Sequence, residues 1–94
     1  MVALPIKSIQ RGTISYDPSS SATGTATITA VVVAKSELRM LGYTMVENSP
    51  DLAAFCDALP RITLTNTTTI TATSASTTAF ITNVTVSWEL TEYY

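Results

Sequence analysis

Threonine alternates with small apolar residues over long stretches of this chain, and that alternation restricts the fold more than any other feature. Between Ala22 and Ala34 every even position is alanine, glycine, isoleucine or valine, whereas the odd positions from 23 to 29 are all threonine. The segment from Arg61 to Thr73 largely repeats this pattern. Because successive side chains of a β-strand point to opposite faces, a period of two predicts strands with one apolar and one polar face.

The clearest strand is predicted near the end of the sequence, over residues 80–90. Its even positions are apolar apart from position 82, and its odd positions from 83 to 89 are polar. One face of this strand should therefore lie in the core, and Trp88 should lie there with its neighbours of the same parity. The apolar residues assigned to this face are Phe80, Val84, Val86, Trp88 and Leu90.

The first third of the chain is predicted to form two paired strands. Residues 6–16 do not keep one register of apolar positions, and Gly12 is predicted to form a bulge that resets the faces. Residues 17–21 are Asp-Pro-Ser-Ser-Ser, which favours a turn. Strands 6–16 and 22–34 should therefore form a hairpin. Because residues 31–33 are all valine, the second half of strand 22–34 should be covered on both faces.

The middle of the chain combines strands with one helical signal. Residues 35–45 are predicted to form a strand with a bulge near Gly42, and Asn66 marks a bulge or a turn between two short strands. Ser-Pro-Asp at 49–51 is typical of a helix start, since a hydroxyl caps the helix and proline fits its first turn. A short helix near residues 50–59 is therefore predicted, with a loop as the alternative.

Together these segments predict an all-β fold. Six or seven strands separated by turn signals, in only 94 residues, are typical of a small antiparallel β-sandwich or barrel. A chain of this length forms one hydrophobic core, so residues 1–94 are expected to be a single domain.

The residue inventory argues against catalysis and against bound metals or cofactors. The sequence contains no histidine, which removes serine–histidine and cysteine–histidine pairs and histidine metal ligands. The seven acidic residues form no alternating calcium-binding loop and are expected to be solvated on the surface. The three glycines are too far apart to cradle a phosphate. Cys56, the single cysteine, is expected to be a buried, unreactive thiol.

The charge pattern and the lengths of the apolar runs argue against nucleic acid and membranes as partners. A net charge of −2 and five scattered basic residues offer no footprint for nucleic acid. No apolar run approaches the roughly 18 residues that cross a bilayer. Charged residues make up only 13% of the chain against a usual value of about 25%, so much of its surface is neutral. Such a surface favours contact with other proteins, including copies of itself in a homo-oligomer.

Two groups of side chains are the candidates for a subunit interface. Residues 35–45 carry apolar side chains on both predicted faces, and one of those faces needs a second surface to cover it. Aromatic residues also gather at the end of the sequence, and exposed tyrosines are favoured at protein interfaces. The candidate interface residues are Leu41, Tyr43, Met45, Tyr93 and Tyr94.

Four segments resemble small virion proteins of tailed bacteriophages. They are Ile6-Lys7-Ser8-Ile9-Gln10-Arg11-Gly12, Ala34-Lys35-Ser36 leading into Leu38-Arg39-Met40-Leu41-Gly42, Leu64-Thr65-Asn66-Thr67-Thr68-Thr69-Ile70-Thr71-Ala72, and Val84-x-Val86-x-Trp88-Glu89-Leu90-x-Glu92-Tyr93. Such proteins are structural, and they include head decoration proteins and tail or fibre components. The resemblance implies a protein that is made in the bacterial host cytoplasm, folds without disulfides and is present in many copies on the virion.

Three functions follow as hypotheses. The first is a capsid-surface decoration or cement protein that bridges subunits of the major capsid protein. The second is a tail or tail-fibre component that contacts a glycan on the host surface. The third is a free carbohydrate-binding or inhibitor-like β domain.

Overall fold

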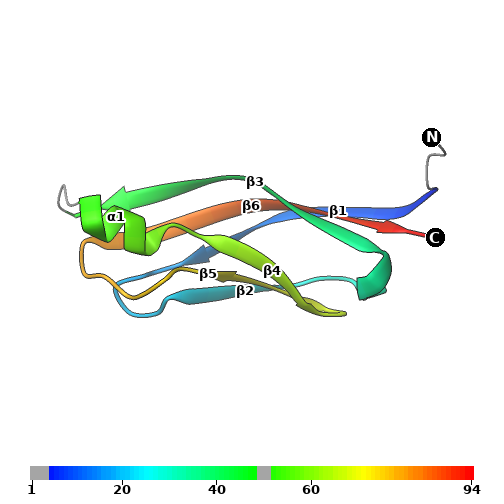
Figure 1. Ribbon diagram of the computed structural model, residues 1–94, viewed down its shortest axis with the longest axis horizontal. Coiled ribbons are helices and arrows are strands. Elements are labelled where there is room, and N and C mark those ends of the chain that lie inside the picture. Colours follow the sequence, from blue (N-terminus) through cyan, green and yellow to red (C-terminus); the bar gives the residue numbers. More distant parts are fainter. Residues whose placement is uncertain (1–4, 49–51) are drawn as a thin grey trace.

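The computed structural model of the chain describes residues 5–48 and 52–94. Over these residues the chain forms six strands in two antiparallel sheets, which confirms the predicted all-β fold (Figure 1). One sheet has the order β1-β6-β3 and the other the order β2-β5-β4. The elements are β1 (Ile6–Tyr16), β2 (Thr23–Thr27), the 3₁₀ turn η1 (Val33–Lys35), β3 (Ser36–Glu47), α1 (Leu52–Ala58), β4 (Arg61–Asn66), β5 (Thr69–Thr73) and β6 (Ile81–Tyr93).

The two sheets face each other in a long, thin, sandwich-like arrangement (Figure 1). The molecule measures 48 × 26 × 17 Å, and its radius of gyration of 15.0 Å exceeds the ~12 Å typical of a compact chain of this length. The strands of the first sheet are about twice as long as those of the second, at 11 to 13 residues against 5 or 6. The short sheet therefore covers only part of the long one.

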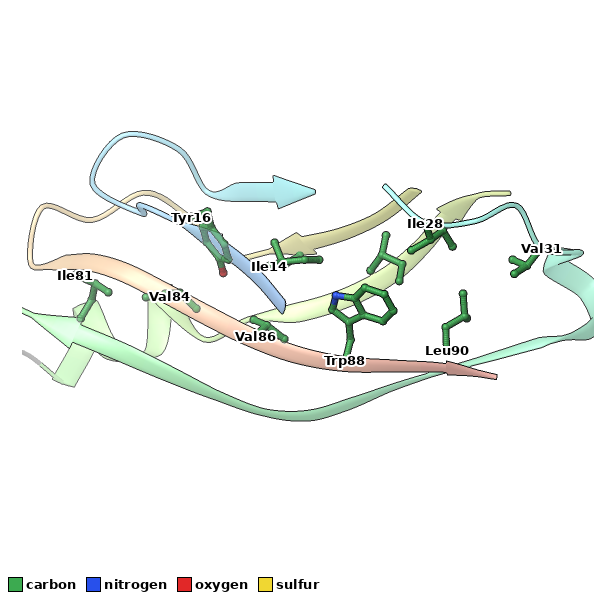
Figure 2. Packing of buried hydrophobic residues seen from close by; sticks show 12 residues of the cluster. Ile14, Tyr16, Ile28, Val31, Ile81, Val84, Val86, Trp88 and Leu90 are labelled. Atoms are coloured by element: carbon green, nitrogen blue, oxygen red, sulfur yellow. The ribbon is translucent and has the colours of Figure 1, made fainter. Parts of the chain in front are cut away.

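The core lies between the sheets and is centred on β6 (Figure 2). The predicted inner face of β6 is confirmed, since its even positions from Val84 to Leu90 are buried. Phe80 is the exception, because β6 begins at Ile81 and the Phe80 side chain remains exposed. Further buried side chains come from β1, from the segment after β2 and from β5 of the facing sheet: Ile14, Tyr16, Ile28, Ile70 and Ala72.

The predicted hairpin of residues 6–16 with 22–34 is wrong. β1 pairs with β6 and β2 pairs with β5, so the turn after Tyr16 carries the chain from one sheet to the other. β1 and β2 instead pack face to face, and a Cβ atom on Gly24 would lie only 2.9 Å from Cβ of Tyr16. β2 therefore lies opposite β1 and not beside it.

The predicted bulge at Gly12 is also wrong. The register of β1 against β6 is unbroken from Ser8 to Tyr16, and its irregularity lies between Ile6 and Ser8. A glycine is needed at position 12 for a different reason, because the Trp88 ring lies against it. A Cβ atom at this position would be 2.8 Å from Cζ2 of Trp88, closer than side-chain atoms approach each other.

The segment predicted as one strand from 22 to 34 is a strand only from Thr23 to Thr27. Beyond it the chain is held to the turn between β4 and β5, where the N–H of Ile28 donates to the carbonyl of Thr68 and that of Val31 to Thr67. Ile28 and Val31 are buried, whereas Val32 and Val33 are exposed. The predicted strand is therefore wrong for residues 31–33, and of the three valines only Val31 is covered.

Other predictions for the middle of the chain are confirmed. A register shift in β3 lies between Met40 and Gly42, and the chain turns at Asn66, whose Oδ1 accepts the N–H of Thr68 at 2.9 Å. α1 spans Leu52–Ala58, within the predicted helical segment. The predicted helix start at residues 49–51 lies outside the described residues.

Cys56 in α1 is exposed, which corrects the expectation of a buried thiol. The helix turns Ala54 and Ala58 towards the core, and these two residues are one turn apart. Cys56 lies halfway between them in sequence and therefore on the opposite side of the helix. The four-residue spacing of the two alanines determines which face of α1 is buried.

The turn after β1 gives a prediction for pH dependence. Oδ1 of Asp17 accepts the backbone N–H of Ser19 at 2.9 Å and also its hydroxyl, and these hydrogen bonds lower the pKa of the Asp17 carboxyl. Since the folded-state pKa is lowered, the stabilisation is present above the unfolded pKa and is lost as pH falls through the folded pKa. Ser19→Ala should raise the Asp17 pKa towards its ordinary value in an NMR titration, and an unchanged pKa would contradict this assignment.

Candidate protein-interaction surface

The two long sides of the molecule, one bordered by β1 and β2 and the other by β3 and β4, differ in how tightly the two sheets contact each other. On the β1 side, the Gln10 side chain links β1 to the segment that follows β2, since its Nε2 donates to the carbonyl of Thr29 at 3.0 Å. Its Oε1 accepts the N–H of the same residue at 2.9 Å. Together with the close packing of Gly24 against Tyr16, these contacts hold β1 to β2 and the segment after it along this side of the molecule.

The opposite side is bordered by β3, and it is open. β3 is an edge strand of 12 residues, whereas β4, the edge of the facing sheet, has only 6. Met40 and Tyr43 pair in register with the buried residues Trp88 and Val86 of β6, yet 42% and 39% of their own surfaces are exposed. The shorter facing sheet leaves these two apolar side chains uncovered.

Leu41 increases this apolar surface because it is the extra residue of a β-bulge. β6 pairs Trp88 with Met40 and Ser87 with Gly42, so Leu41 has no partner across the strand. It is 57% exposed. Bulges are common on edge strands, where they change the direction of side chains. We refer to Met40, Leu41 and Tyr43, with the unpaired backbone edge of β3, as the β3 edge surface.

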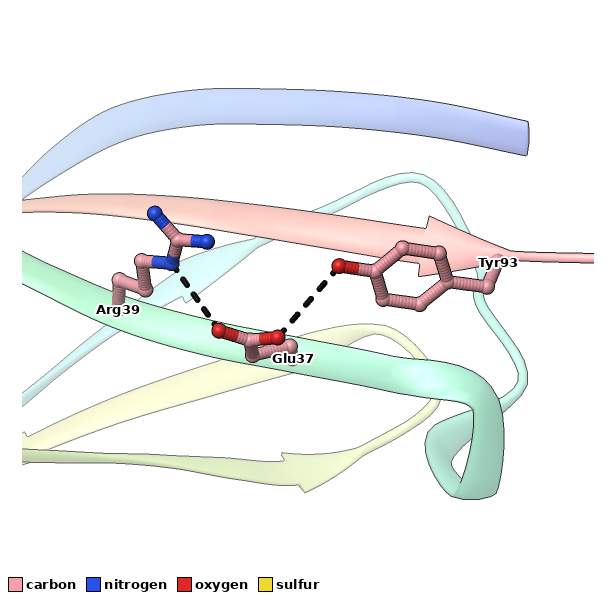
Figure 3. A network of polar contacts seen from close by, with 3 residues as sticks. All are labelled: Glu37, Arg39 and Tyr93. Atoms are coloured by element: carbon pink, nitrogen blue, oxygen red, sulfur yellow. Dashed lines mark hydrogen bonds and ion pairs between the residues drawn. The ribbon is translucent and has the colours of Figure 1, made fainter. Parts of the chain in front are cut away.

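The outer face of the same sheet carries charged groups that neutralise one another. Nε of Arg11 lies 2.8 Å from Oε2 of Glu89, and Nε of Arg39 lies 3.1 Å from Oε1 of Glu37. The Tyr93 hydroxyl donates to the other oxygen of Glu37 at 3.5 Å (Figure 3). The hydrogen bond from Arg39 to Glu37 also raises the pKa of the guanidinium. This face therefore presents paired charged and polar groups to solvent, whereas the β3 edge surface presents apolar side chains.

The residues predicted as interface candidates do not form one cluster. Leu41 and Tyr43 belong to the β3 edge surface, whereas Met45 is only partly exposed and packs against the core. Tyr93 is half-buried at the end of β6, and Tyr94 is exposed beside Pro5, whose carbonyl accepts its N–H at 3.2 Å. The β6 partner of Met40 is Trp88, five residues from Tyr93, which is about 17 Å along a strand.

Sequence reasoning missed two residues that matter here. Met40 shares the even parity of the inner face before the bulge, but only the length difference between the sheets exposes it. Glu92 was expected on the surface, yet it is 4% exposed. One of its oxygens accepts the N–H of Val32 at 2.7 Å and the other the hydroxyl of Ser8 at 3.5 Å. Its parity, shared with Trp88 and Leu90, was the available signal for burial.

Residues 5–48 and 52–94 offer neither a cluster of metal-binding side chains nor a helix that could span a membrane. No three side chains of the metal-binding types gather there. In the same part of the chain no helix is both long and apolar enough to span a bilayer.

Comparisons of the chain with protein-family models, with curated proteins and with solved structures found no match. The class of protein defined by the fold is a small all-β protein built from two antiparallel sheets. Any functional assignment must rest on the chemistry of its own surface.

Proposed function

We propose that this protein is a non-catalytic structural subunit of a tailed-bacteriophage virion. Its place would be the capsid surface, where it bridges neighbouring subunits of the major capsid protein. The observation that carries the proposal is the β3 edge surface, which joins three exposed apolar side chains to an unpaired strand edge. Apolar surface and free backbone groups at one edge favour pairing with another protein.

The shape of the molecule supports a bridging role. Its 48 Å length allows contacts with more than one neighbour, and its 17 Å thickness allows it to lie flat on a larger surface. Burial of apolar area contributes roughly 25 cal/mol per Å², so each added copy would stabilise a junction between capsid subunits. A virion made in the bacterial host cytoplasm also suits a domain that contains one cysteine and so forms no internal disulfide.

The glycan-contacting alternatives gain no support from the tyrosines. Tyr16 is buried, and its hydroxyl shares a hydrogen bond with Ser74 in the core. Tyr43 lies on β3, whereas Tyr93 and Tyr94 lie at the end of β6. A sugar-binding face usually gathers several exposed aromatic side chains, and these four are dispersed.

The proposal is tested by locating and counting the protein on purified virions. Immunogold labelling should mark heads, and quantitative mass spectrometry should give a copy number proportional to that of the major capsid protein. Particles that lack the protein should release their DNA at a lower temperature than complete particles. Labelling of tails, or only a few copies per virion, would favour a tail component, and absence from virions would refute the proposal.

A further inference from the structure

The bulge at Leu41 changes which residues of β3 share a face. Leu38 and Met40 pair with Leu90 and Trp88 of β6, so both lie on the inner face. After the bulge the inner-face positions become odd, at Tyr43 and Met45, which pair with Val86 and Val84. An even residue before the bulge therefore shares a face with an odd residue after it.

This shift makes β3 complementary to itself. Suppose that Met40 lies opposite Tyr43 of an antiparallel second copy. In that register the other facing pairs are Leu38 with Met45, Arg39 with Thr44, and Glu37 with Val46. Each of these pairs lies on one face, as an antiparallel ladder requires, because the bulge falls at the centre of the arrangement. A regular strand in the same register would place every pair on opposite faces.

The charges at the two ends of β3 also favour antiparallel pairing with a second copy. Lys35 precedes β3 and Glu47 ends it, and within the described residues neither forms an ion pair. An antiparallel second copy brings Lys35 near Glu47 of that copy at both ends of the ladder. The register places no like charges directly opposite each other, which would be unfavourable. By contrast, β1 paired with itself about the exposed Ile9 would set Lys7 opposite Arg11.

We propose that two copies of this chain pair through their β3 edges about a two-fold axis between Leu41 and Gly42. The dimer joins two three-stranded sheets into one continuous sheet of six strands. Pairing supplies hydrogen bonds to the free edge and brings the Met40 sulfur against the Tyr43 ring, a favourable contact. Two-fold pairing of one patch with itself is the commonest symmetry of soluble oligomers. The inference goes beyond the proposed function, because a second copy then covers the β3 edge surface, and the unit that bridges capsid subunits becomes the dimer, which contacts them through its remaining faces.

Sedimentation equilibrium on the purified chain tests the dimer. The wild type should have twice the 10.0 kDa mass of one chain. Leu41→Glu places two carboxylates beside the axis, and self-association should weaken by more than about tenfold. The matched control is Ile6→Glu on β1, since Ile6 is 53% exposed and Leu41 57%, and this variant should remain dimeric. Circular dichroism checks that both variants are folded. A monomeric wild type, or equal loss of dimer in both variants, would overturn the proposal.

Cysteine cross-linking tests the register. In a Cys56→Ser background, Met40→Cys and Tyr43→Cys variants are oxidised separately and as a mixture. The mixture should give disulfide-linked dimers, whereas each variant alone should give few. Equal cross-linking in all three samples would contradict the register. A monomeric protein found in many copies on capsids would refute the dimer alone, and a dimer absent from virions would refute only the proposed function.

Discussion

Trp88→Ala should lower the free energy of unfolding by about 3–5 kcal/mol, as expected when a large buried aromatic side chain is removed. Trp88 lies in the central strand of the long sheet, its side chain is in the core (Figure 2), and it is 5% exposed. Its ring lies against Gly12. A stability of only about 5–15 kcal/mol is typical of a domain, so this single change should remove a large part of it. Urea unfolding followed by circular dichroism measures the loss.

Trp88→Phe is the matched control for this prediction. Among the described residues the buried Nε1 of Trp88 has no hydrogen-bond partner, and an unsatisfied buried donor costs about 1–3 kcal/mol. Phenylalanine keeps a ring against Gly12 and removes that donor, so the two effects partly offset each other. The expected loss is below about 1.5 kcal/mol, as for a swap between hydrophobic residues of similar size. A loss equal to that of Trp88→Ala would show that the indole N–H is bonded.

Glu92→Ala should lower the free energy of unfolding by about 1–3 kcal/mol, because it leaves the N–H of Val32 without its acceptor. The Glu92 carboxylate also accepts the Ser8 hydroxyl. This side chain of β6 therefore connects β1 to Val32, the residue before η1. The loss should be accompanied by faster hydrogen exchange in the segment from Val31 to Lys35. Chemical denaturation and exchange measured by mass spectrometry give the two quantities.

Glu92→Gln separates the hydrogen bond from the charge. The glutamine carbonyl can accept the same N–H, and no buried charge has to be desolvated, so the change in stability should stay within about 1 kcal/mol. If the glutamine variant lost as much as the alanine variant, the negative charge itself would be required. That result would contradict the account of Glu92 as an acceptor for backbone and hydroxyl groups.

The period-two pattern predicted the strands well where one face was apolar and the other polar. β5 follows it over its whole length and β6 from Asn83 to Leu90, because the alternation specifies both the extended backbone and the buried side. The pattern failed at Val32 and Val33, which are exposed. Consecutive apolar residues do not alternate, so they are compatible both with a strand covered on two faces and with an exposed segment. The pattern also could not predict which strands pair, because alternation indicates the buried face of a strand and not its neighbour in the sheet.

The candidate surface was predicted in part. Leu41 and Tyr43 were identified from apolar residues on both faces of residues 35–45, and both are exposed on β3. Met40 was missed because its exposure depends on how far the facing sheet extends, a tertiary property. Tyr93 and Tyr94 were grouped with them on composition alone, and the strand register separates the two groups.

The β3 edge surface is proposed to be the place where a protein neighbour docks. Hydrogen–deuterium exchange of the protein in intact particles, compared with the free chain at high dilution, tests it most directly. Amides of β3 (Ser36–Glu47) should exchange more slowly in the particle than in the free chain, whereas those of the edge strand β2 (Thr23–Thr27) should exchange at nearly the same rate in both states. Equal exchange of β3 in the two states would contradict it.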